Sequence, residues 1–347
     1  INLAGLVSSD LTWEKASIFN IGLDFTMLNQ RLDFSFDWYQ RTTSDMLVKV
    51  EYPEVLGTTA PPANKAELRT RGWEVSVKWN DRIGNDFSYD LGFILSDSQA
   101  EITKYENPSG TLSDYYVGQK IGEIWGYETE GFYQSDTDVQ NHADQSKLGA
   151  NWAPGDIMYK DLDGNKKINN GSNTLDDHGD LKVIGNTTPR YQYGITANMS
   201  YKNVYLNVFF QGIGKRDFWP SSQPFWPVAT QYYNTQKWFV TDSWSEDNRD
   251  AYFARPIARE TKNQQKQTKY LQDASYCRLK NLTVGYDFPK SWLSFLHVAK
   301  AGVYFSAENL FEFTNVKGAY DPEAAGKNGT MVYPFQRTYS FGLNVTF

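Results

Sequence analysis

The last nine residues of the chain alternate between apolar and polar side chains without an error. Tyr339, Phe341, Leu343, Val345 and Phe347 fall on one face of an extended strand, and the small or polar residues between them fall on the other. Five large apolar side chains on an exposed strand face would promote aggregation unless an apolar medium such as lipid covered them. The segment therefore favours a transmembrane β-barrel, in which each strand has one lipid-facing side and one wet side.

The same alternation recurs along the chain and predicts about nine strands. Most of the segments have the length of about 9 to 11 residues that a tilted membrane-spanning strand needs. They cover 17–28, 31–41, 71–80, 86–97, 190–201, 203–211, 275–288, 301–311 and 338–347.

Short and long spacers separate these strands in turn. The spacers after the first, third and fifth strands are short, and those after the second, fourth, sixth and eighth are long (42–70, 98–189, 212–274 and 312–337). Outer-membrane barrels show this asymmetry, with tight periplasmic turns and long extracellular loops. The pattern predicts extracellular loops, a periplasmic C-terminus, and a short amphipathic helical turn after the seventh strand.

The amino-acid composition further limits the classes of protein to which this chain can belong. Aromatic residues make up 16% of the chain although its mean hydropathy is −0.59, which suits strands that are apolar on one side only. The sequence contains no run of about 18 apolar residues that could form a membrane-spanning helix. The net charge of −7 argues against a nucleic-acid partner, and a single cysteine, Cys277, excludes an internal disulfide.

The predicted number of strands is odd, which indicates that these strands form only part of a barrel. Single-chain bacterial barrels have an even number of strands, with both ends in the periplasm. We therefore expect residues 1–347 to be the C-terminal part of one barrel domain, about nine strands of a 22-stranded barrel, with a plug and earlier strands outside this chain.

Several strings resemble one family of transporters in their order along the chain. They lie at 13–25, 31–41, 45–47, 71–74, 185–191, 276–286, 308–311 and 320–323, and the closing strand completes them. With these strings the chain resembles the SusC/RagA family of TonB-dependent outer-membrane transporters.

This resemblance implies a function for the complete protein. Members of that family enclose an N-terminal plug, carry a SusD-like surface lipoprotein as a lid, and import oligosaccharides or peptides with energy delivered through TonB. The resemblance also implies that the protein is located in the outer membrane of a Gram-negative bacterium. Charged residues of the predicted inner face are expected to solvate the lumen and contact the plug; they are Asp24, Asp33, Asp37, Glu74, Lys78 and Asp90.

One loop segment resembles the start of a calcium loop. Asp161, Asp163 and Asn165 stand at positions 1, 3 and 5, where oxygen ligands converge on one cation. Lys166 replaces the usual Gly, and Ser172 replaces the usual bidentate Glu. Asp176, Asp177 or Asp180 are candidates for the missing carboxylate, and an Asx-rich surface turn is the alternative.

The long spacer at 212–274 is rich in aromatic residues that suit a sugar ring or a partner protein. The candidates for contact with substrate or lid are Trp219, Trp226, Tyr232, Tyr233 and Trp238. The alternative is that these residues pack the loop onto itself. We favour this self-packing, or contact with the lid, over direct binding of substrate.

No motif of an enzyme is found: the histidines lack HExxH spacing, and no G-x-S-x-G elbow occurs. The chain is therefore expected not to be an enzyme. Two rival interpretations remain, an outer-membrane enzyme with an active site on the loops, and a soluble carbohydrate-binding β protein.

Overall fold

A computed structural model describes residues 11–49, 61–228, 234–294, 298–318, 320–325 and 335–347. Nine antiparallel strands form one sheet, in which neighbours in the chain are neighbours in space once the elements of the long connections are left out. All nine predicted strands are confirmed. Their bounds are β1 (Lys15–Met27), β2 (Leu32–Lys49), β3 (Pro62–Ile83), β4 (Phe87–Lys104), β9 (Arg190–Tyr201), β10 (Val204–Lys215), β13 (Tyr276–Asp287), β14 (Lys300–Thr314) and β15 (Thr338–Thr346).

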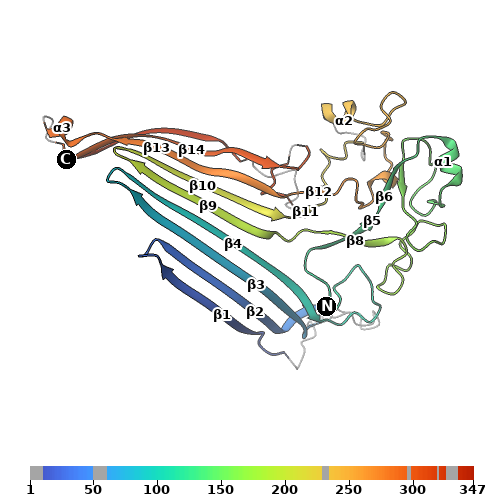
Figure 1. Ribbon diagram of the computed structural model, residues 1–347. Helices are drawn as coiled ribbons and strands as arrows, with labels where there is room; N and C mark the ends of the chain where they lie inside the picture. Colours follow the sequence, from blue (N-terminus) through green and yellow to red (C-terminus); the bar gives the residue numbers. More distant parts are fainter. Residues whose placement is uncertain (1–10, 50–60, 229–233, 295–297, 319, 326–334) are drawn as a thin grey trace, which may run out of the picture.

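The connections are sorted between the two ends of this sheet (Figure 1). Tight turns, the C-terminus and the short helix α3 (Lys290–Leu293) lie at one end, and the described parts of the long connections lie at the other. This confirms the predicted asymmetry, including the helical turn after the seventh strand. Within the described residues, no helix is long and apolar enough to cross a membrane.

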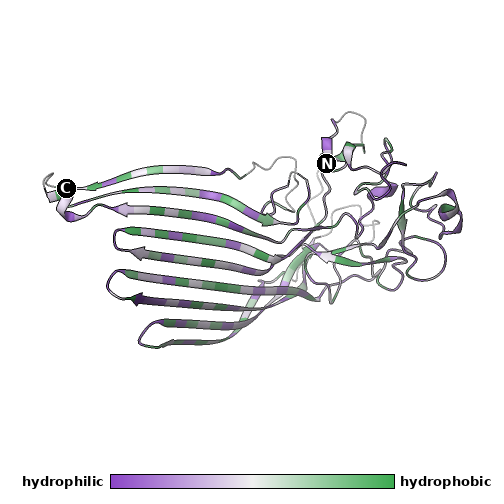
Figure 2. Ribbon diagram, turned by 45° about the horizontal axis from the view of Figure 1, so that its top comes forward, coloured by the Kyte–Doolittle hydropathy of each residue, from purple (hydrophilic) through white to green (hydrophobic). Residues whose placement is uncertain are grey.

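The register joins the apolar side chains of different strands into continuous rows, and Figure 2 shows the alternation of hydrophobic and hydrophilic residues along the individual strands. One row crosses all nine strands and contains only apolar residues: Met27, Leu32, Trp79, Leu91, Ala197, Val208, Leu282, Ala307 and Tyr339. The adjacent row on the opposite side is mostly polar: Thr26, Asp33, Lys78, Gly92, Thr196, Phe209, Asn281, Glu308 and Thr338. The sheet therefore has one apolar and one polar side along its whole width.

The apolar side has the height of a membrane core. From Tyr339 to Phe347 the chain extends about 27 Å along the strand direction, and a tilt of about 40° reduces this to about 21 Å. Outer-membrane barrels have an apolar band about 25 Å tall. Toward the loops the band ends at the paired residues Trp38 and Trp73, because the next row pairs Gln40 with Arg71.

The long connections contain small elements of their own. Three two-stranded sheets pair β5 (Glu123–Tyr127) with β8 (Leu181–Asn186), β6 (Thr129–Phe132) with β7 (Ile157–Tyr159), and β11 (Asp217–Phe218) with β12 (Gln272–Asp273). Short helices complete them: α1 (Asp136–Asn141), α2 (Lys237–Thr241) and the 3-10 helix η2 (Lys262–Gln264).

Candidate functional site

The polar side of the sheet is its hollow side. A hollow of about 470 Å³ opens across β2, β3, β4, β9 and β10, and most of its lining side chains belong to the polar side. A second hollow of about 610 Å³ lies nearer the tight turns. In a closed barrel, this polar and hollowed side would face the lumen.

Two carboxylates face each other in the first hollow. Asp37 and Glu74 are directly paired across β2 and β3, and both line the hollow. Among the residues that the structure describes, neither carboxylate has an ion-pair partner. Like charges directly opposite each other destabilise a sheet. The arrangement therefore suits a cationic group supplied from outside the sheet.

The two longest connections fold onto each other at the loop end of the sheet. We call residues 105–189, between β4 and β9, together with residues 216–275, between β10 and β13, the loop assembly. Its buried core takes side chains from both connections: Tyr127, Phe132, Ile157, Tyr159, Ile168, Phe225, Trp226, Phe239, Trp244, Ala251, Phe253, Ala254 and Tyr270.

The predicted aromatic contacts take part in this packing. Trp226 is buried and donates its indole N–H to the carbonyl of Pro220 at 2.7 Å. Trp219 lies against Trp226, and Trp238 packs edge-on against Phe253. Self-packing of the loop thus accounts for Trp226. Contact of Trp219 and Trp238 with substrate or lid stays a prediction, and Tyr232 and Tyr233 lie outside the described residues.

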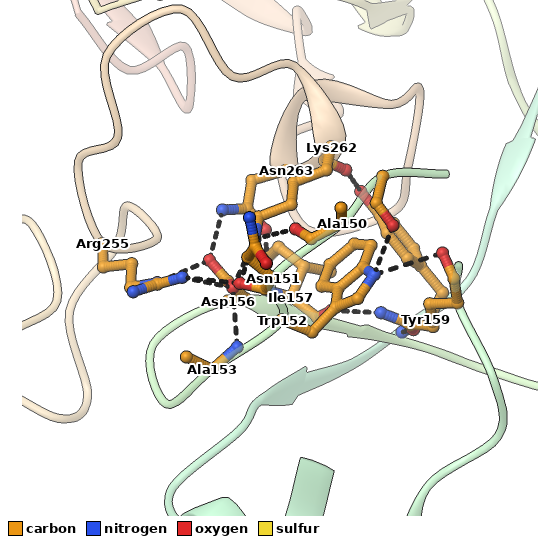
Figure 3. Close-up of polar contacts among 12 residues, drawn as sticks. Ala150, Asn151, Trp152, Ala153, Asp156, Ile157, Tyr159, Arg255, Lys262 and Asn263 are labelled. Carbon is orange, nitrogen blue, oxygen red and sulfur yellow. Dashed lines mark hydrogen bonds and ion pairs between the residues drawn. The ribbon is translucent and has the colours of Figure 1, made fainter. Parts of the chain in front are cut away.

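A buried polar cluster, drawn in Figure 3, locks the two connections together. Asp156 has no solvent exposure and accepts hydrogen bonds from Arg255 at 2.8 Å and from Asn263 at 2.9 Å. The ammonium of Lys262 lies 2.9 Å from the same carboxylate. That ammonium also donates to the carbonyls of Ala150 and Asn151, and it lies over the ring of Trp152.

The electrostatics of this cluster favour the charged carboxylate. Burial alone would raise the pKa of Asp156, but hydrogen bonds from Arg255, Asn263 and Lys262 together hold this pKa below its ordinary value of 3.8. Nearby, burial raises the pKa of both Tyr127 and Tyr252 to about 12. The core of the loop assembly is therefore built for a charged Asp156 and neutral tyrosines.

The calcium-like loop brings three carboxylates together. Oxygens of Asp161, Asp163 and Asp180 lie within 4.8 Å of one another. Asp180, one of three candidates for the missing ligand, is fully buried, whereas Asp177 instead accepts hydrogen bonds from Ser172. These hard oxygens fit a cation such as calcium.

Backbone groups already engage the same oxygens. Asp180 accepts from the N–H groups of Leu162 and Asn169, and Asp161 accepts from that of Lys166. Lys166 has a φ of 62°, the left-handed conformation for which calcium loops use glycine. Asn165 accepts from the N–H of Lys167. Calcium binding stays a prediction.

Sequence strings that resemble the SusC/RagA family contact each other in pairs. Glu14 accepts a hydrogen bond from the N–H of Leu47, and Lys15 pairs with Asp45 at 2.9 Å, so strings 13–25 and 45–47 meet. Strings 276–286 and 320–323 also meet, through the guanidinium of Arg278. Alternation within a strand carries no information on which loop returns to it, so these pairings are not predictable from the sequence pattern.

Comparison with known proteins gives relatives along almost the whole chain, although no protein-family model matches it. TonB-dependent receptor P3 of Formosa agariphila is 30% identical over 371 residues, which cover 99% of this chain and 35% of the relative. TonB-dependent receptor SusC of Bacteroides thetaiotaomicron is 26% identical over 355 residues, covering 98% of this chain and 32% of the relative. The chain thus spans about a third of the length of these relatives.

Solved structures give the same fold. The RagAB peptide transporter matches with a TM-score of 0.72 and 24% identity, over 97% of this chain and 36% of that one. The RagAB peptide importer in its closed-closed state matches with a TM-score of 0.71 and 25% identity, again over 97% and 36%. These relatives are named as receptors and transporters, which supports the expectation of a non-enzyme. The predicted fold class, part of a transmembrane barrel, is confirmed.

Proposed function

Because the homologues of this chain are TonB-dependent receptors of the SusC and RagA type, we propose that it forms a sector of the barrel wall of an outer-membrane nutrient importer. One observation carries this proposal. The register of the nine strands yields an apolar row that runs unbroken from Met27 to Tyr339, backed by a polar and hollowed side. A wall of this kind separates lipid from a wet lumen.

The proposed orientation places the loops outside the cell. The tight turns, α3 and Phe347 would lie at the periplasmic rim of a Gram-negative outer membrane, and the loop assembly would lie on the extracellular side. The distribution of connections and the end of the apolar band at Trp38 and Trp73 support this orientation. Residues 1–347 would then belong to one barrel domain, in which β1 and β15 each pair with a single strand among the described residues and could accept a neighbouring strand at the other edge.

A plug is the proposed occupant of the polar side. The unpaired carboxylates of Asp37 and Glu74 suit a basic side chain of the plug, and the surrounding serine and glutamine side chains suit its polar backbone. The plug would carry the contact with TonB.

A SusD-like surface lipoprotein is the proposed lid over the loop assembly, and oligosaccharides or peptides are the proposed cargo. The similarity to SusC and to the RagAB peptide transporter supports this partner and this range of cargo.

The test is uptake by cells that carry the complete transporter with its lid lipoprotein. We expect the protein in the outer-membrane fraction, with heat-modifiable electrophoretic migration, and uptake of fluorescent oligosaccharides or peptides that is lost when TonB is deleted. Uptake that persists without TonB, or a protein found in the soluble fraction, would overturn the proposal. Turnover of cargo outside the cell without uptake would favour the enzyme alternative.

A further inference from the structure

Two positive side chains of β13 hold a loop segment against the polar side of the sheet. Arg278 donates to Glu323 at 2.6 Å and to Asp321 at 2.7 Å, and the side chain of Arg278 is only 1% exposed. Lys280 donates to both carboxylate oxygens of Glu323, at 3.0 and 3.1 Å. The two acidic residues come from the connection between β14 and β15.

The position of Arg278 shows which side of the sheet this segment covers. Arg278 is paired with Gln211 on β10 and with Glu312 on β14. Gln211 lines the hollow of the polar side. The guanidinium and its two carboxylates therefore lie on the side that would face the lumen, at the loop end of β13.

A bulge in β13 allows both positive side chains to serve the same segment. Against β10 the register shifts between Leu279 and Asn281 and leaves Lys280 as the extra residue of β13, whereas against β14 two residues of β14 stand opposite Lys280. Bulges re-aim side chains and change the facing of the residues that follow. Lys280 thus joins Arg278 on Glu323, while Leu282 returns to the apolar row.

The other side of the segment is packed against the loop assembly. Tyr320 lies edge-on to Phe218 at 5.3 Å between ring centroids and shares a hydrogen bond with Ser222. Ala325 is 2% exposed and packs with Phe218 and Ala274. The segment is therefore held between the sheet and the loop assembly by contacts on both of its sides.

We infer that residues 320–325 form a fixed ledge over the polar side of β13, that this ledge closes its sector of the lumen mouth, and that Arg278 is the positioning residue that holds it. The term lumen rests on the proposed function, whereas the ledge itself rests on the contacts above. Cargo and plug would then meet the wall at β2, β3, β4, β9 and β10, where the hollow of about 470 Å³ lies open.

Thiol labelling of the full-length transporter tests this inference. In a background with Cys277→Ser, Ala325→Cys supplies one buried thiol, and Ser245→Cys on an exposed loop supplies the control. A membrane-impermeant maleimide applied to whole cells is expected to label the control quickly and Ala325→Cys slowly. Arg278→Gln should raise the labelling rate of Ala325→Cys by roughly a hundredfold, because it leaves two acidic partners without their main cation.

The conservative variant separates positioning from a general loss of structure. Arg278→Lys should give an intermediate rate, since one ammonium cannot bind both carboxylates as a planar guanidinium does. Glu323→Gln should also raise the rate, and it lies outside the strands, so it keeps the test valid if Arg278→Gln prevents assembly. Heat-modifiable migration confirms a folded barrel in each variant.

An unchanged labelling rate in both Arg278→Gln and Glu323→Gln would overturn the ledge, as would fast labelling of Ala325→Cys with Arg278 intact. If the Ser245→Cys control is not labelled on cells, the proposed orientation fails instead, and labelling of the detergent-solubilised transporter then decides the ledge by the same two criteria.

Discussion

Asp156 and Lys262 form a 2.9 Å ion pair inside the loop assembly, with side chains that are 0% and 1% exposed. They come from different connections of the sheet, so this pair joins two loops that the chain itself keeps far apart. Desolvation makes such a pair costly to form but more costly to break, because removal of one partner leaves the other charge buried alone.

Replacement of the cation should loosen the loops without unfolding the barrel. Lys262→Met is expected to lower the free energy of unfolding of the loop assembly by about 3–5 kcal/mol, because Asp156 would keep only part of its neutralisation. Limited proteolysis of the full-length transporter measures this as faster cleavage within 105–189 and 216–275, with heat-modifiable migration unchanged. The matched control Lys147→Met removes an exposed lysine, and the loop assembly of this variant should be cleaved at the original rate. Equal cleavage rates for Lys262→Met and Lys147→Met would contradict the prediction.

Acid should weaken the loop assembly through the same carboxylate. The folded-state pKa of Asp156 lies below its ordinary value of 3.8, so its stabilising contribution is present above that value and is lost as the pH falls through the folded-state pKa. We expect the near-ultraviolet circular dichroism of the aromatic core to stay constant from about pH 7 to about pH 5 and to decline below about pH 4. In Asp156→Asn the loss of this circular dichroism signal below about pH 4 should disappear. A signal loss with its midpoint near neutral pH would show that Asp156 is not the group responsible.

A charge on the apolar side should disrupt the barrel according to its depth. Val77→Arg places a cation near the middle of the apolar band and should cost about 2–4 kcal/mol, whereas Ile83→Arg at the tight-turn end should cost at most about 1 kcal/mol. Both residues lie on β3, and their partners Phe93 and Phe87 lie on β4. The yield of heat-modifiable barrel and the urea midpoint in lipid measure the difference, and equal costs at the two depths would show that lipid does not cover this side.

The carboxylates of Asp161, Asp163 and Asp180 define a test for calcium. Added calcium is expected to slow proteolysis within 157–186 in the transporter, and Asp180→Asn should abolish this protection because it removes the buried carboxylate of the cluster. Terbium luminescence gives a direct reading of occupancy. Glu246→Gln, an exposed carboxylate of the other connection, serves as the control. If the rate of proteolysis within 157–186 is the same with and without calcium, the segment is an Asx-rich surface turn and not a calcium site.

Alternation along the sequence is enough to predict the nine strands, because lipid on one side and water on the other impose a period of two. Alternation does not reveal the parts of the strands that extend beyond the contrast between lipid and water. The segment predicted at 71–80 belongs to a strand that runs from Pro62 to Ile83, and the segment predicted at 31–41 continues to Lys49. Just beyond Trp38 and Trp73, polar residues occupy both sides of the strands at 40–45 and 69–71, so the pattern that marks a strand disappears while the hydrogen-bonded ladder goes on.

The candidate sites were predicted less completely, since they depend on contacts between distant segments. The choice among Asp176, Asp177 and Asp180 needed the fold of the whole loop, because Asp180 joins the cluster only after the chain turns back. Trp226 is a candidate for contact with substrate or lid, with self-packing of the loop as the alternative, and only the fold shows that Tyr270 from the far end of the same connection helps to bury it. No local pattern pointed to the pairing of Arg278 with Asp321.

The shared core of the loop assembly also sets an order of events during folding. Tyr159 and Tyr270 sit on connections whose ends are fixed by β4, β9, β10 and β13, four consecutive strands of the sheet. Before these strands align, a contact between the two connections would have to close a long and flexible loop, at a cost in chain entropy. Once these strands align, the starting points of the two connections are already side by side, so the loop assembly acquires its structure last, templated by a sheet that is already in place.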